Sequence, residues 1–286
     1  MAMDGAFSNF FSGSDLTVAY KKFRPTYPEE LVKKIVKFGG EKLGDLKFVV
    51  DVGCGSGQST AMLSDHSERV LGVDISPDQI KQAKASTMPS NVEFSVGSCE
   101  AIPVDALSVD LITVGTAVHW FDLDKFYKEV DRVLKPGGAL AIYTYNGTQA
   151  EIEDDAEKTD EINAMLRKFE YEVMSVTRPK QWQDLFNDPQ NTFSLLELPY
   201  RDSRRDVKLA LKNRRTVAGM VGLIKSYSEC KEFLRTHPNG DEAFTDLQNK
   251  IMAVLKTDKS ADETQITCVL PIFLAMSRKP IFPSAE

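Results

Sequence analysis

The chain lacks the residues and patterns that mark several protein classes. Its 286 residues include three histidines and four scattered cysteines, with no Cys-x-x-Cys pair. This pattern predicts neither a zinc site nor a disulfide framework, and reduced thiols in the cytosol are the simplest account. No apolar run is long enough to cross a bilayer, and residues 1–11 lack the features of a signal peptide. We therefore expect a cytoplasmic protein with no metal and no membrane partner.

A basic excess is also missing. The sequence has 35 Lys and Arg against 42 Asp and Glu, a net charge of −7. This argues against a general nucleic-acid binder, because binding to backbone phosphates needs a basic surface. Repeats and low-complexity tracts are absent as well. The hydrophobic share of 42% is close to that of globular proteins, so a substantial core is expected.

The densest glycine pattern of the chain follows a short apolar run. Residues 48–52 are typical of a strand buried on both faces, and residues 58–63 can open a helix. Three glycines stand between them at alternate positions: Gly53, Gly55 and Gly57. A strand, a glycine turn and a helix N-terminus together form a place where a ligand can approach bare backbone. The Gly-x-Gly-x-Gly spacing, preceded by Asp51, departs from the Gly-x-Gly-x-x-Gly of dinucleotide-binding enzymes.

The next predicted strand, residues 69–74, ends in an acid. Asp74 lies at the right distance after the glycine turn to accept hydrogen bonds from both ribose hydroxyls of a nucleoside. Any adenosine ligand has this requirement, so Asp74 alone does not separate NAD from other nucleosides. Ser76 and Pro77 then make a well-capped helix start, with Gln79 completing a capping box.

The remaining chain alternates strands and helices. Further strands are expected at residues 91–96, 109–114, 139–145, 193–198 and 264–276, and helices at residues 28–38, 57–65, 123–134 and 162–169, with one more starting at Pro77. This order predicts an α/β fold with a Rossmann-like, doubly wound sheet of seven strands. The sheet should be mostly parallel, with the last strand antiparallel beside residues 193–198. Pro271 predicts a bulge or an edge position in that last strand.

A single domain over residues 1–286 is expected, in three parts. Residues 1–27 are rich in aromatics and either fold over the ligand as a lid or dock as a structural arm. Residues 28–146 form the cofactor-binding core. Residues 147–286 form a C-terminal half with a helical substrate cap and the last two strands.

Four motifs occur in order along the core: Asp-Val-Gly-Cys-Gly-Ser-Gly (51–57), Gly-Val-Asp-Ile-Ser-Pro (72–77), Ala-Val-His-Trp-Phe-Asp (117–122) and Arg-Val-Leu-Lys-Pro-Gly-Gly (132–138). With Tyr20 and Arg-Pro-Thr-Tyr-Pro at residues 24–28, the chain resembles class I methyltransferases. It is similar to the small-molecule enzymes that include trans-aconitate methyltransferase. The likeness is strong over about residues 15–146. It implies S-adenosylmethionine as the cofactor and S-adenosylhomocysteine as the product.

The expected cofactor contacts combine the glycine turn and Asp74 with positions that the resemblance implies. They are Tyr20, Arg24, Asp51, Gly53, Cys54, Gly55, Gly57, Asp74, Ile75, Ser98, Cys99, Glu100, Thr116 and Ala117. By the same resemblance, His119 and Trp120 would border the methyl-acceptor pocket and take part in catalysis.

The C-terminal half carries a basic cluster in an otherwise acidic protein: Arg201, Arg204, Arg205, Lys208, Lys212, Arg214 and Arg215. We expect most of it to form the solvated face of a helix, paired with Asp202 and Asp206. The alternative is a cationic wall for an acidic substrate. Arg214, Arg215 and Tyr227 are the candidates for substrate binding.

Methyl transfer from a sulfonium is a direct displacement that needs the acceptor in line with a free lone pair. A carboxylate is already ionised at neutral pH and needs no base, whereas a hydroxyl or amine can need one, and His119 is the histidine placed for it. The favoured function is a methyltransferase acting on the carboxylate oxygen of a small molecule. Its alternatives are a hydroxyl, amine or thiol acceptor, and a non-catalytic cofactor-binding interaction protein. The glycine spacing argues against an NAD enzyme. No nucleic-acid partner is expected, and the protein should be a monomer or weak dimer.

Overall fold

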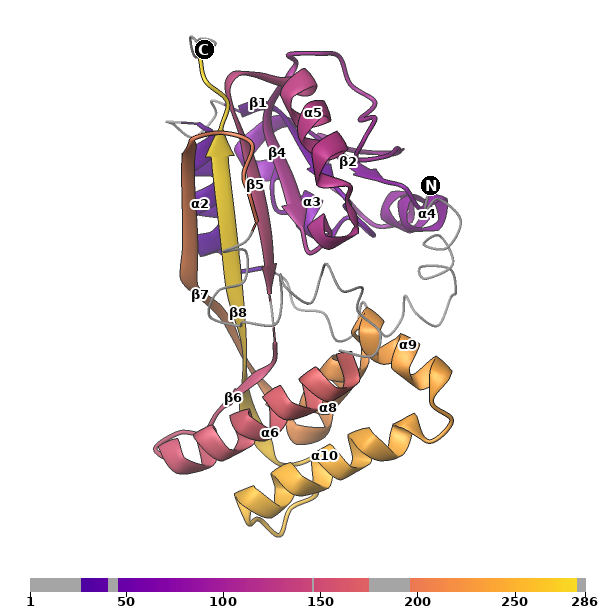
Figure 1. Ribbon diagram of the computed structural model, residues 1–286, viewed down its shortest axis with the longest axis vertical. Coiled ribbons are helices and arrows are strands. Elements are labelled where there is room, and N and C mark those ends of the chain that lie inside the picture. Colours follow the sequence, from indigo (N-terminus) through magenta and orange to yellow (C-terminus); the bar gives the residue numbers. More distant parts are fainter. Residues whose placement is uncertain (1–26, 41–45, 146, 175–195, 282–286) are drawn as a thin grey trace.

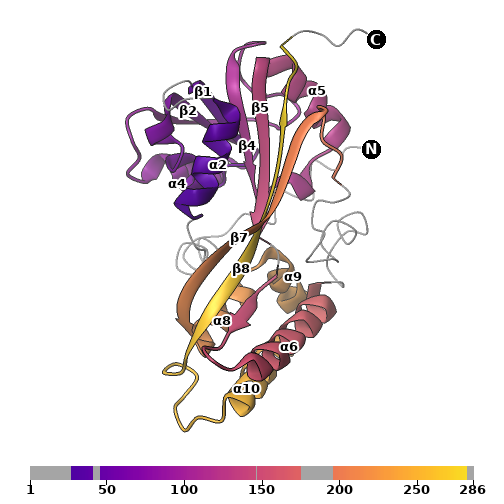
Figure 2. The ribbon, with the colours of Figure 1, turned by 90° about the vertical axis from the view of Figure 1, so that its left-hand side faces the viewer.

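The structure is a computed structural model that describes residues 27–40, 46–145, 147–174 and 196–281. Residues 1–26 of the expected lid, with Tyr20 and Arg24, lie outside the described part, and Tyr27 is the one lid residue within it. Figure 1 shows two lobes, a sheet flanked by helices above and a group of helices below. Two long strands run through both, as the side view of Figure 2 shows.

One sheet holds all strands that the described residues form. Its order is β3-β2-β1-β4-β5-β8-β6, with β7 pairing β8. The bounds are β1 Leu46–Val52, β2 Ser67–Asp74, β3 Val92–Val96, β4 Val109–Gly115, β5 Leu134–Tyr145, β6 Gln149–Glu151, β7 Asp202–Thr216 and β8 Gln265–Arg278. Strands β1 to β5 are parallel, and β8 is antiparallel to β5, β6 and β7. The predicted Rossmann-like fold with an antiparallel last strand is confirmed; the short β6 is an addition to the seven strands expected.

The helices are α2 Glu29–Gly39, α3 Gln58–Ala61, α4 Pro77–Ala85, α5 Leu123–Val133, α6 Ala156–Met174, α8 Val217–Lys225, α9 Ser228–Thr236 and α10 Gly240–Leu255, with 3₁₀ turns η2 Ser64–His66 and η3 Val118–Trp120. Neighbouring strand residues point to opposite faces of the sheet, so Val49 packs in the core under α2 and Val50 in the core under α5. Both valines have no exposed surface. Helices thus cover the two faces of the upper sheet.

Helix α5 shows how the sequence positions the site. Asp122 caps it, with Oδ1 accepting a hydrogen bond from the Lys125 amide at 3.3 Å. Phe126, Val130 and Val133 recur at helical spacing and are fully buried. Burying each such side chain contributes about 1.5–3 kcal/mol. This anchoring fixes the residues just before Asp122, which belong to the candidate site.

The expected helix at residues 57–65 is wrong in length. Helix α3 is a single turn, and the chain then tightens into 3₁₀ hydrogen bonds, from the Met62 amide to the Ser59 carbonyl and from the Leu63 amide to the Thr60 carbonyl. The Ser59 and Thr60 side chains donate to the Asp51 carboxylate beneath the turn. These tertiary bonds hold the turn where local propensity alone would continue a helix.

The expected solvated helix over the basic cluster is also wrong. Residues 202–216 form strand β7, which pairs with β8 along its length. Of the expected strand at residues 193–198, residues 196–198 are irregular and the others lie outside the described part. Pairing with β8 is a long-range contact that a local charge pattern cannot reveal. The exposed basic side chains of β7 suit an edge strand, where charge discourages pairing with other chains.

Pro271 does not lie on an edge strand, because β8 runs between β7 and the pair of β5 and β6. It lies where the β5 ladder ends at the pair Tyr145–Ile272, just before the β6 ladder begins at Gln149–Val269. Proline has no backbone N–H to donate, and between the two strand pairings β8 needs no donor on this side. A register shift does occur nearby, but in β7 between Asp206 and Leu209.

The lower lobe has its own core. Helices α6, α8, α9 and α10 pack with β6 and the lower halves of β7 and β8 around Ile162, Leu166, Leu223 and Ile251, which have no exposed surface. The chain enters this lobe from the upper sheet through β5 (Figure 1). None of the helices within the described residues is long and apolar enough to cross a membrane.

Candidate active site

The expected site elements meet at one edge of the sheet. The glycine turn follows β1, Asp74 ends β2, and residues 116–122 follow β4. These strands are parallel neighbours, so their carboxyl ends lie side by side. In open α/β sheets this edge binds ligands. Here it faces the helical lobe (Figure 1).

The three glycines of the turn have different roles. All have positive φ, +72° at Gly53, +55° at Gly55 and +86° at Gly57. A Cβ on Gly53 would lie 2.5 Å from Ala117 Cβ, and one on Gly57 would lie 2.6 Å from Phe94 Cζ. At Gly55 the nearest atom would be Gln79 Oε1, 3.9 Å away. Among the described residues, a Cβ on Gly55 would meet only this ordinary van der Waals contact, whereas protein fills the places beside Gly53 and Gly57.

Asp51 is fully buried, so its side chain has no surface for a ligand. The expected direct contact to the cofactor is therefore corrected. Its Oδ2 accepts hydrogen bonds from Ser59 Oγ at 3.0 Å and Thr60 Oγ1 at 2.7 Å, and its Oδ1 from Thr113 Oγ1 at 2.8 Å. Burial raises the pKa of Asp51, and the three hydroxyls oppose that rise. Asp51 thus ties the glycine turn and β4 together from beneath.

Asp74 is partly buried at the end of β2. Its Oδ2 accepts a hydrogen bond from the Gly55 amide and its Oδ1 one from the Ser76 amide, both at 2.8 Å. Burial raises its pKa, against the pull of these two amides. A carboxylate has about four acceptor sites, so each oxygen can take a further donor. The open side of Gly55 and this carboxylate together fit a ligand with two neighbouring hydroxyls.

The loop after β3 is clamped to α5. The Ile102 amide donates to Glu129 Oε1 at 2.6 Å, and Arg132 Nε and Nη2 donate to both oxygens of Glu129. Arg132 Nη2 also donates to the Ile102 carbonyl at 3.0 Å. Sequence reasoning missed this pair. Its signal, a Glu and an Arg three apart on a helix, is too common to have singled it out.

The expected adenine contacts lie on that clamped loop and beside Asp74. Ser98 Oγ accepts a hydrogen bond from the Glu100 amide at 3.1 Å, and Glu100 pairs with Lys125 at 3.4 Å. Burial raises the pKa of Cys99 to about 12, so the group is a thiol and packs rather than reacts. Cys54 is buried with Phe94 behind the turn. Ile75 is 64% exposed directly after Asp74, an apolar side chain that is free to cover a ligand.

The turn after β4 sits directly on the glycine turn. Ala117 Cβ occupies the place of a Gly53 side chain, and Phe121 Cζ lies 3.4 Å from the same point. Residues 118–120 form the 3₁₀ turn η3, in which the half-buried His119 and Trp120 rings lie 5.1 Å apart. The structure thus brings the two expected catalytic residues next to the expected cofactor loop.

The expected arginines do not join them. Along β5 and β8, Gly115 is level with Tyr143 and Leu274, whereas Arg215 pairs with Ile266, eight residues further along β8. At about 3.3 Å per residue this is about 26 Å. Arg214 is exposed, and its side chain alternates to the other face of the sheet from that of Arg215. No described contact places either arginine beside His119 or Trp120.

Tyr227 is buried at the start of α9. Its hydroxyl lies 2.9 Å from Thr148 Oγ1, and its ring lies 6.3 Å from that of Tyr145, the last residue of β5. Tyr145 in turn lies 6.0 Å from Tyr27. Tyr227 is therefore a buried residue of the helical lobe that packs near the end of β5.

Tyr27 is the residue that sequence reasoning undervalued. The sequence assigns it to the aromatic lid of residues 1–27 and to the Arg-Pro-Thr-Tyr-Pro motif, with no individual role. Its hydroxyl lies 2.5 Å from Thr116 Oγ1, and its ring packs edge-on against Tyr143 at 4.8 Å. The contact joins residues 89 positions apart, so no local pattern could have revealed it.

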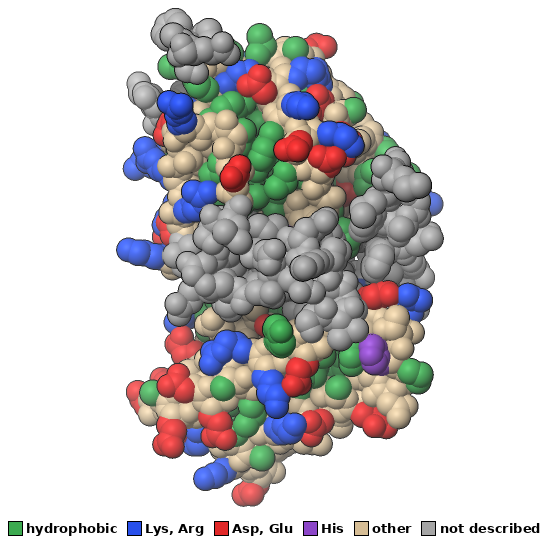
Figure 3. All heavy atoms as spheres, viewed as in Figure 1, with side chains coloured by type: hydrophobic (Ala, Val, Ile, Leu, Met, Phe, Trp, Pro, Cys, Tyr) green, Lys and Arg blue, Asp and Glu red, His purple; other side chains and the backbone are tan. Residues whose placement is uncertain are grey.

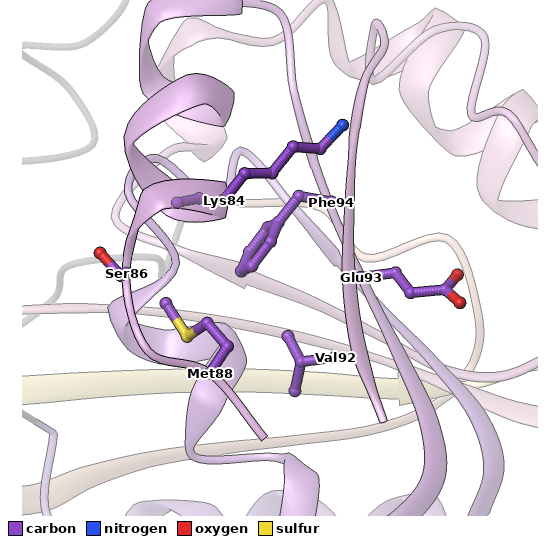
Figure 4. Close-up of a pocket in the computed structure, with 7 residues that line it drawn as sticks. Lys84, Ser86, Met88, Val92, Glu93 and Phe94 are labelled. Carbon is purple, nitrogen blue, oxygen red and sulfur yellow. The ribbon is translucent and has the colours of Figure 1, made fainter. Parts of the chain in front are cut away.

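A hollow lies on the other side of Phe94 from the glycine turn. This hollow of about 420 Å³ opens between α4 and β3, beside Lys84, Met88 and Phe94 (Figure 4). Phe94 lines it and also packs against Gly57, so the ring lies between the hollow and the glycine turn. Among the residues with described placement, no three His, Cys, Asp or Glu gather as a metal site would require.

Comparisons with known proteins agree with this geometry. The methyltransferase-domain family matches residues 50–142, which run from β1 through most of β5. A Dictyostelium discoideum protein that carries the name of a methyltransferase is 28% identical over 264 residues, 92% of this chain and 93% of its own. A Saccharomyces cerevisiae protein named as an S-adenosylmethionine-dependent methyltransferase is 30% identical, over 44% of each chain.

A solved structure is similar over 90% of this chain. A protein from Anaeromyxobacter dehalogenans, named as a type II methyltransferase, is 25% identical with a TM-score of 0.70, covering 90% of this chain and 99% of its own. The domain match spans the glycine turn, Asp74 and the turn after β4, whose geometry fits a nucleoside ligand. Residues 50–142 are thus a methyltransferase domain, and fold, site and relatives support a class I S-adenosylmethionine-dependent methyltransferase.

Proposed function

We propose that this chain methylates a small molecule at the edge formed by the glycine turn, Asp74 and the turn after β4. The observation that carries the proposal is the contact between Ala117 and Gly53, which sets His119 and Trp120 beside the expected cofactor loop. When bound, S-adenosylmethionine supplies an electrophilic methyl group. Asp74 would hold its ribose, Gly55 would let it approach the backbone, and Ile75 would cover its base.

The size and charge of the acceptor follow from the surroundings. The strand ends face the helical lobe, and an acceptor that binds between two lobes is more readily a small molecule than a polymer (Figure 1). Figure 3 shows basic and acidic side chains interspersed over the visible described surface, without a single-sign field. A nucleic acid would need such a basic field. These features support a metabolite as the acceptor.

The acceptor atom that we propose first is a carboxylate oxygen, as the resemblance to trans-aconitate methyltransferase suggests. This acceptor is ionised at neutral pH, so the chain need only orient it and exclude water. Support from Arg214 and Arg215 is withdrawn, because the register places them seven and eight residues along β8 from the level of Gly115, about 23 and 26 Å. In their place we propose that His119 and Trp120 orient the acid.

A hydroxyl or amine acceptor is the second candidate, and a different observation favours it. The described hydrogen bonds at and just beyond the ends of β4 and β5 include four hydroxyls and one acid: Tyr27, Thr116, Thr148, Tyr227 and Glu170. Glu170 is 8% exposed and accepts a hydrogen bond from the Thr148 amide at 2.8 Å. Such a set suits a neutral or cationic acceptor, and His119 would then take the proton.

The test is an acceptor screen with a mass readout. Purified protein is incubated with S-adenosylmethionine and a library of acids, including trans-aconitate, alcohols, amines and thiols. A mass gain of one methyl group on an acid, lost in Asp74→Ala, is the expected result. Methylation confined to alcohols or amines would contradict the carboxylate acceptor and support a hydroxyl or amine acceptor. Binding of S-adenosylhomocysteine without turnover on any compound would indicate a non-catalytic binding protein.

Two broader proposals accompany this function. We propose that residues 1–286 act as one domain whose helical lobe caps the acceptor, and that the protein works in the cytoplasm. Limited proteolysis with and without S-adenosylhomocysteine tests the first, because a single domain should be protected as a unit. Cell fractionation tests the second.

A further inference from the structure

Thr116, the residue directly after β4, has a strained backbone. Its φ is +53°, in the left-handed region that β-branched residues rarely adopt. Strain of this kind persists only where the surroundings impose it, and it clusters at functional sites. Three described contacts impose it here. The Thr116 amide donates to the Tyr143 carbonyl at 2.8 Å, Thr144 Oγ1 donates to Thr116 Oγ1 at 3.4 Å, and the Tyr27 hydroxyl lies 2.5 Å from the same Oγ1.

Tyr27 reaches Thr116 from outside the sheet strands. It comes directly before Pro28, which caps α2. Its ring is held by two aromatic neighbours, edge-on against Tyr143 at 4.8 Å and tilted against Tyr145 at 6.0 Å. These contacts fix the ring, so little rotamer freedom is lost when its hydroxyl meets Thr116. The bond joins residues 89 positions apart in the chain.

The conformation of Thr116 determines where the next residue lies. Ala117 Cβ occupies the space of a Gly53 side chain, which leaves no room for movement toward the glycine turn. The Trp120 amide donates to the Ala117 carbonyl at 3.0 Å, so η3 follows Ala117. A relaxation of Thr116 to negative φ would therefore shift Ala117 relative to Gly53 and carry His119 and Trp120 with it.

We propose that the Tyr27–Thr116 hydrogen bond positions η3 against the glycine turn, and that Tyr27 and Thr116 are positioning residues for methyl transfer. The proposal rests on the proposed function, since it concerns the same site. Neither residue needs to touch the acceptor. They hold Ala117, and through it His119 and Trp120, in a fixed position before the reaction, so that no reorganisation energy is needed during methyl transfer.

A plain structural role makes a different prediction. If Tyr27 only anchors α2, its ring packing against Tyr143 is what matters, and removing the hydroxyl changes stability alone. If the hydroxyl bond positions η3, its loss changes ligand binding and the surroundings of Trp120 in a protein that still unfolds cooperatively. Ligand binding and the surroundings of Trp120 therefore distinguish the two roles, whereas the melting temperature does not.

The test uses the full chain and S-adenosylhomocysteine as the probe. The sequence has two tryptophans, Trp120 and Trp182, so a Trp182→Phe background makes fluorescence report on Trp120 alone. In this background we compare Tyr27→Phe, Thr116→Val, Thr116→Ser and Thr116→Gly. Calorimetry gives the dissociation constant, and fluorescence gives the change around Trp120 on binding.

We expect Tyr27→Phe and Thr116→Val each to weaken binding about five- to twentyfold and to reduce the Trp120 signal. Thr116→Ser, which keeps the hydroxyl, should stay within about twofold of the parent protein. Thr116→Gly adopts positive φ without strain but lacks the hydroxyl, so it should fold well and still bind weakly. Since both residues act through one bond, the double variant Tyr27→Phe/Thr116→Val should bind no worse than the weaker single variant.

Binding and fluorescence of Tyr27→Phe equal to those of the parent protein would overturn the proposal. Full binding by Thr116→Gly would do the same, because it would make the strained backbone rather than the bond the controlling feature. Losses that multiply in the double variant would show two independent roles. A parent protein that binds no S-adenosylhomocysteine would contradict the proposed function instead, so the two failures are distinguishable.

Discussion

Ala117 occupies the space that a side chain at Gly53 would need, with only 2.5 Å between its Cβ and the position of a Gly53 Cβ. The two residues lie on different loops, one after β1 and one after β4. Within the described part of the chain, Gly55 is instead the glycine of the turn whose added Cβ would meet no close contact. Substitution should therefore affect the two glycines in different ways.

Gly53→Ala should lower stability far more than Gly55→Ala. Both sites have positive φ, which costs alanine about 1–2 kcal/mol. Gly53→Ala adds a clash with Ala117, worth about 1–3 kcal/mol of overpacking. Urea unfolding measures this difference. Calorimetry should show the reverse order for function: Gly55→Ala folds but loses affinity for S-adenosylhomocysteine, because the new methyl group enters the ligand's space. Equal destabilisation with unchanged affinity in Gly55→Ala would contradict this reading of the turn.

Asp74 should make cofactor binding depend on pH. Ribose hydroxyls need an ionised acceptor, and burial raises the pKa of Asp74 above its usual value near 3.9. Affinity for S-adenosylhomocysteine should thus be complete at neutral pH and decline as pH falls through this raised pKa, before ordinary exposed carboxylates are protonated. Calorimetry between pH 7.5 and about 4.5 tests it. Asp74→Asn is the control: it should bind weakly with no such decline, and a parallel decline in both proteins would assign the effect to another group.

The clamp on the loop after β3 should stabilise the fold in a pH-dependent way. The Arg132 guanidinium and the Ile102 amide hold the pKa of Glu129 below its usual range. A lowered pKa stabilises the fold above the unfolded value near 4.3, and this contribution is lost as pH falls through the folded-state pKa. Glu129→Gln should therefore cost about 1–3 kcal/mol at pH 7 and less near pH 4.

A matched control for the clamp is Glu68→Gln. Glu68 pairs with Lys47 on the surface, with both side chains more than half exposed. Such a pair contributes about 0–1 kcal/mol. Chemical unfolding of both variants at two pH values separates the roles. A loss in Glu129→Gln as small as that in Glu68→Gln would show that the loop does not depend on the clamp.

Local sequence patterns predicted the cofactor half of the molecule well, for identifiable reasons. The strand ending at Asp74 is a short apolar run, and the capped start at Ser76 is a local hydrogen-bond pattern; the structure has both. Such features depend on residues a few positions apart. The positions of Ala117 and His119 beside the glycine turn followed from the parallel order of β1 and β4, which the resemblance supplied.

Long-range pairing explains what the sequence could not predict. Residues 202–216 carry a charge pattern that suits a helix surface, yet β8 makes them a strand. The substrate-binding candidates Arg214 and Arg215 lie on this strand, and the register places Arg215 level with Ile266 in the lower lobe. The bond from Tyr27 to Thr116 spans 89 residues and has no local signature at all. Acceptor contacts depend on such distant pairings more than cofactor contacts do.

The pH dependence of the reaction should distinguish the two acceptor classes. A carboxylate acceptor is ionised above about pH 5, so we expect a rate that is flat from about pH 6 to 8.5 once cofactor binding is saturated. His119 would then orient the acid, and His119→Asn, which keeps a polar side chain of similar reach, should retain more activity than Trp120→Ala. Arg214→Ala should retain full activity, since Arg214 is exposed and pairs with Thr267 far along β8. Rates measured on the acid found in the acceptor screen test all three variants. A rate that rises through a group near pH 6.5 and loses this rise in His119→Asn would make His119 a base, and the acceptor a hydroxyl or amine.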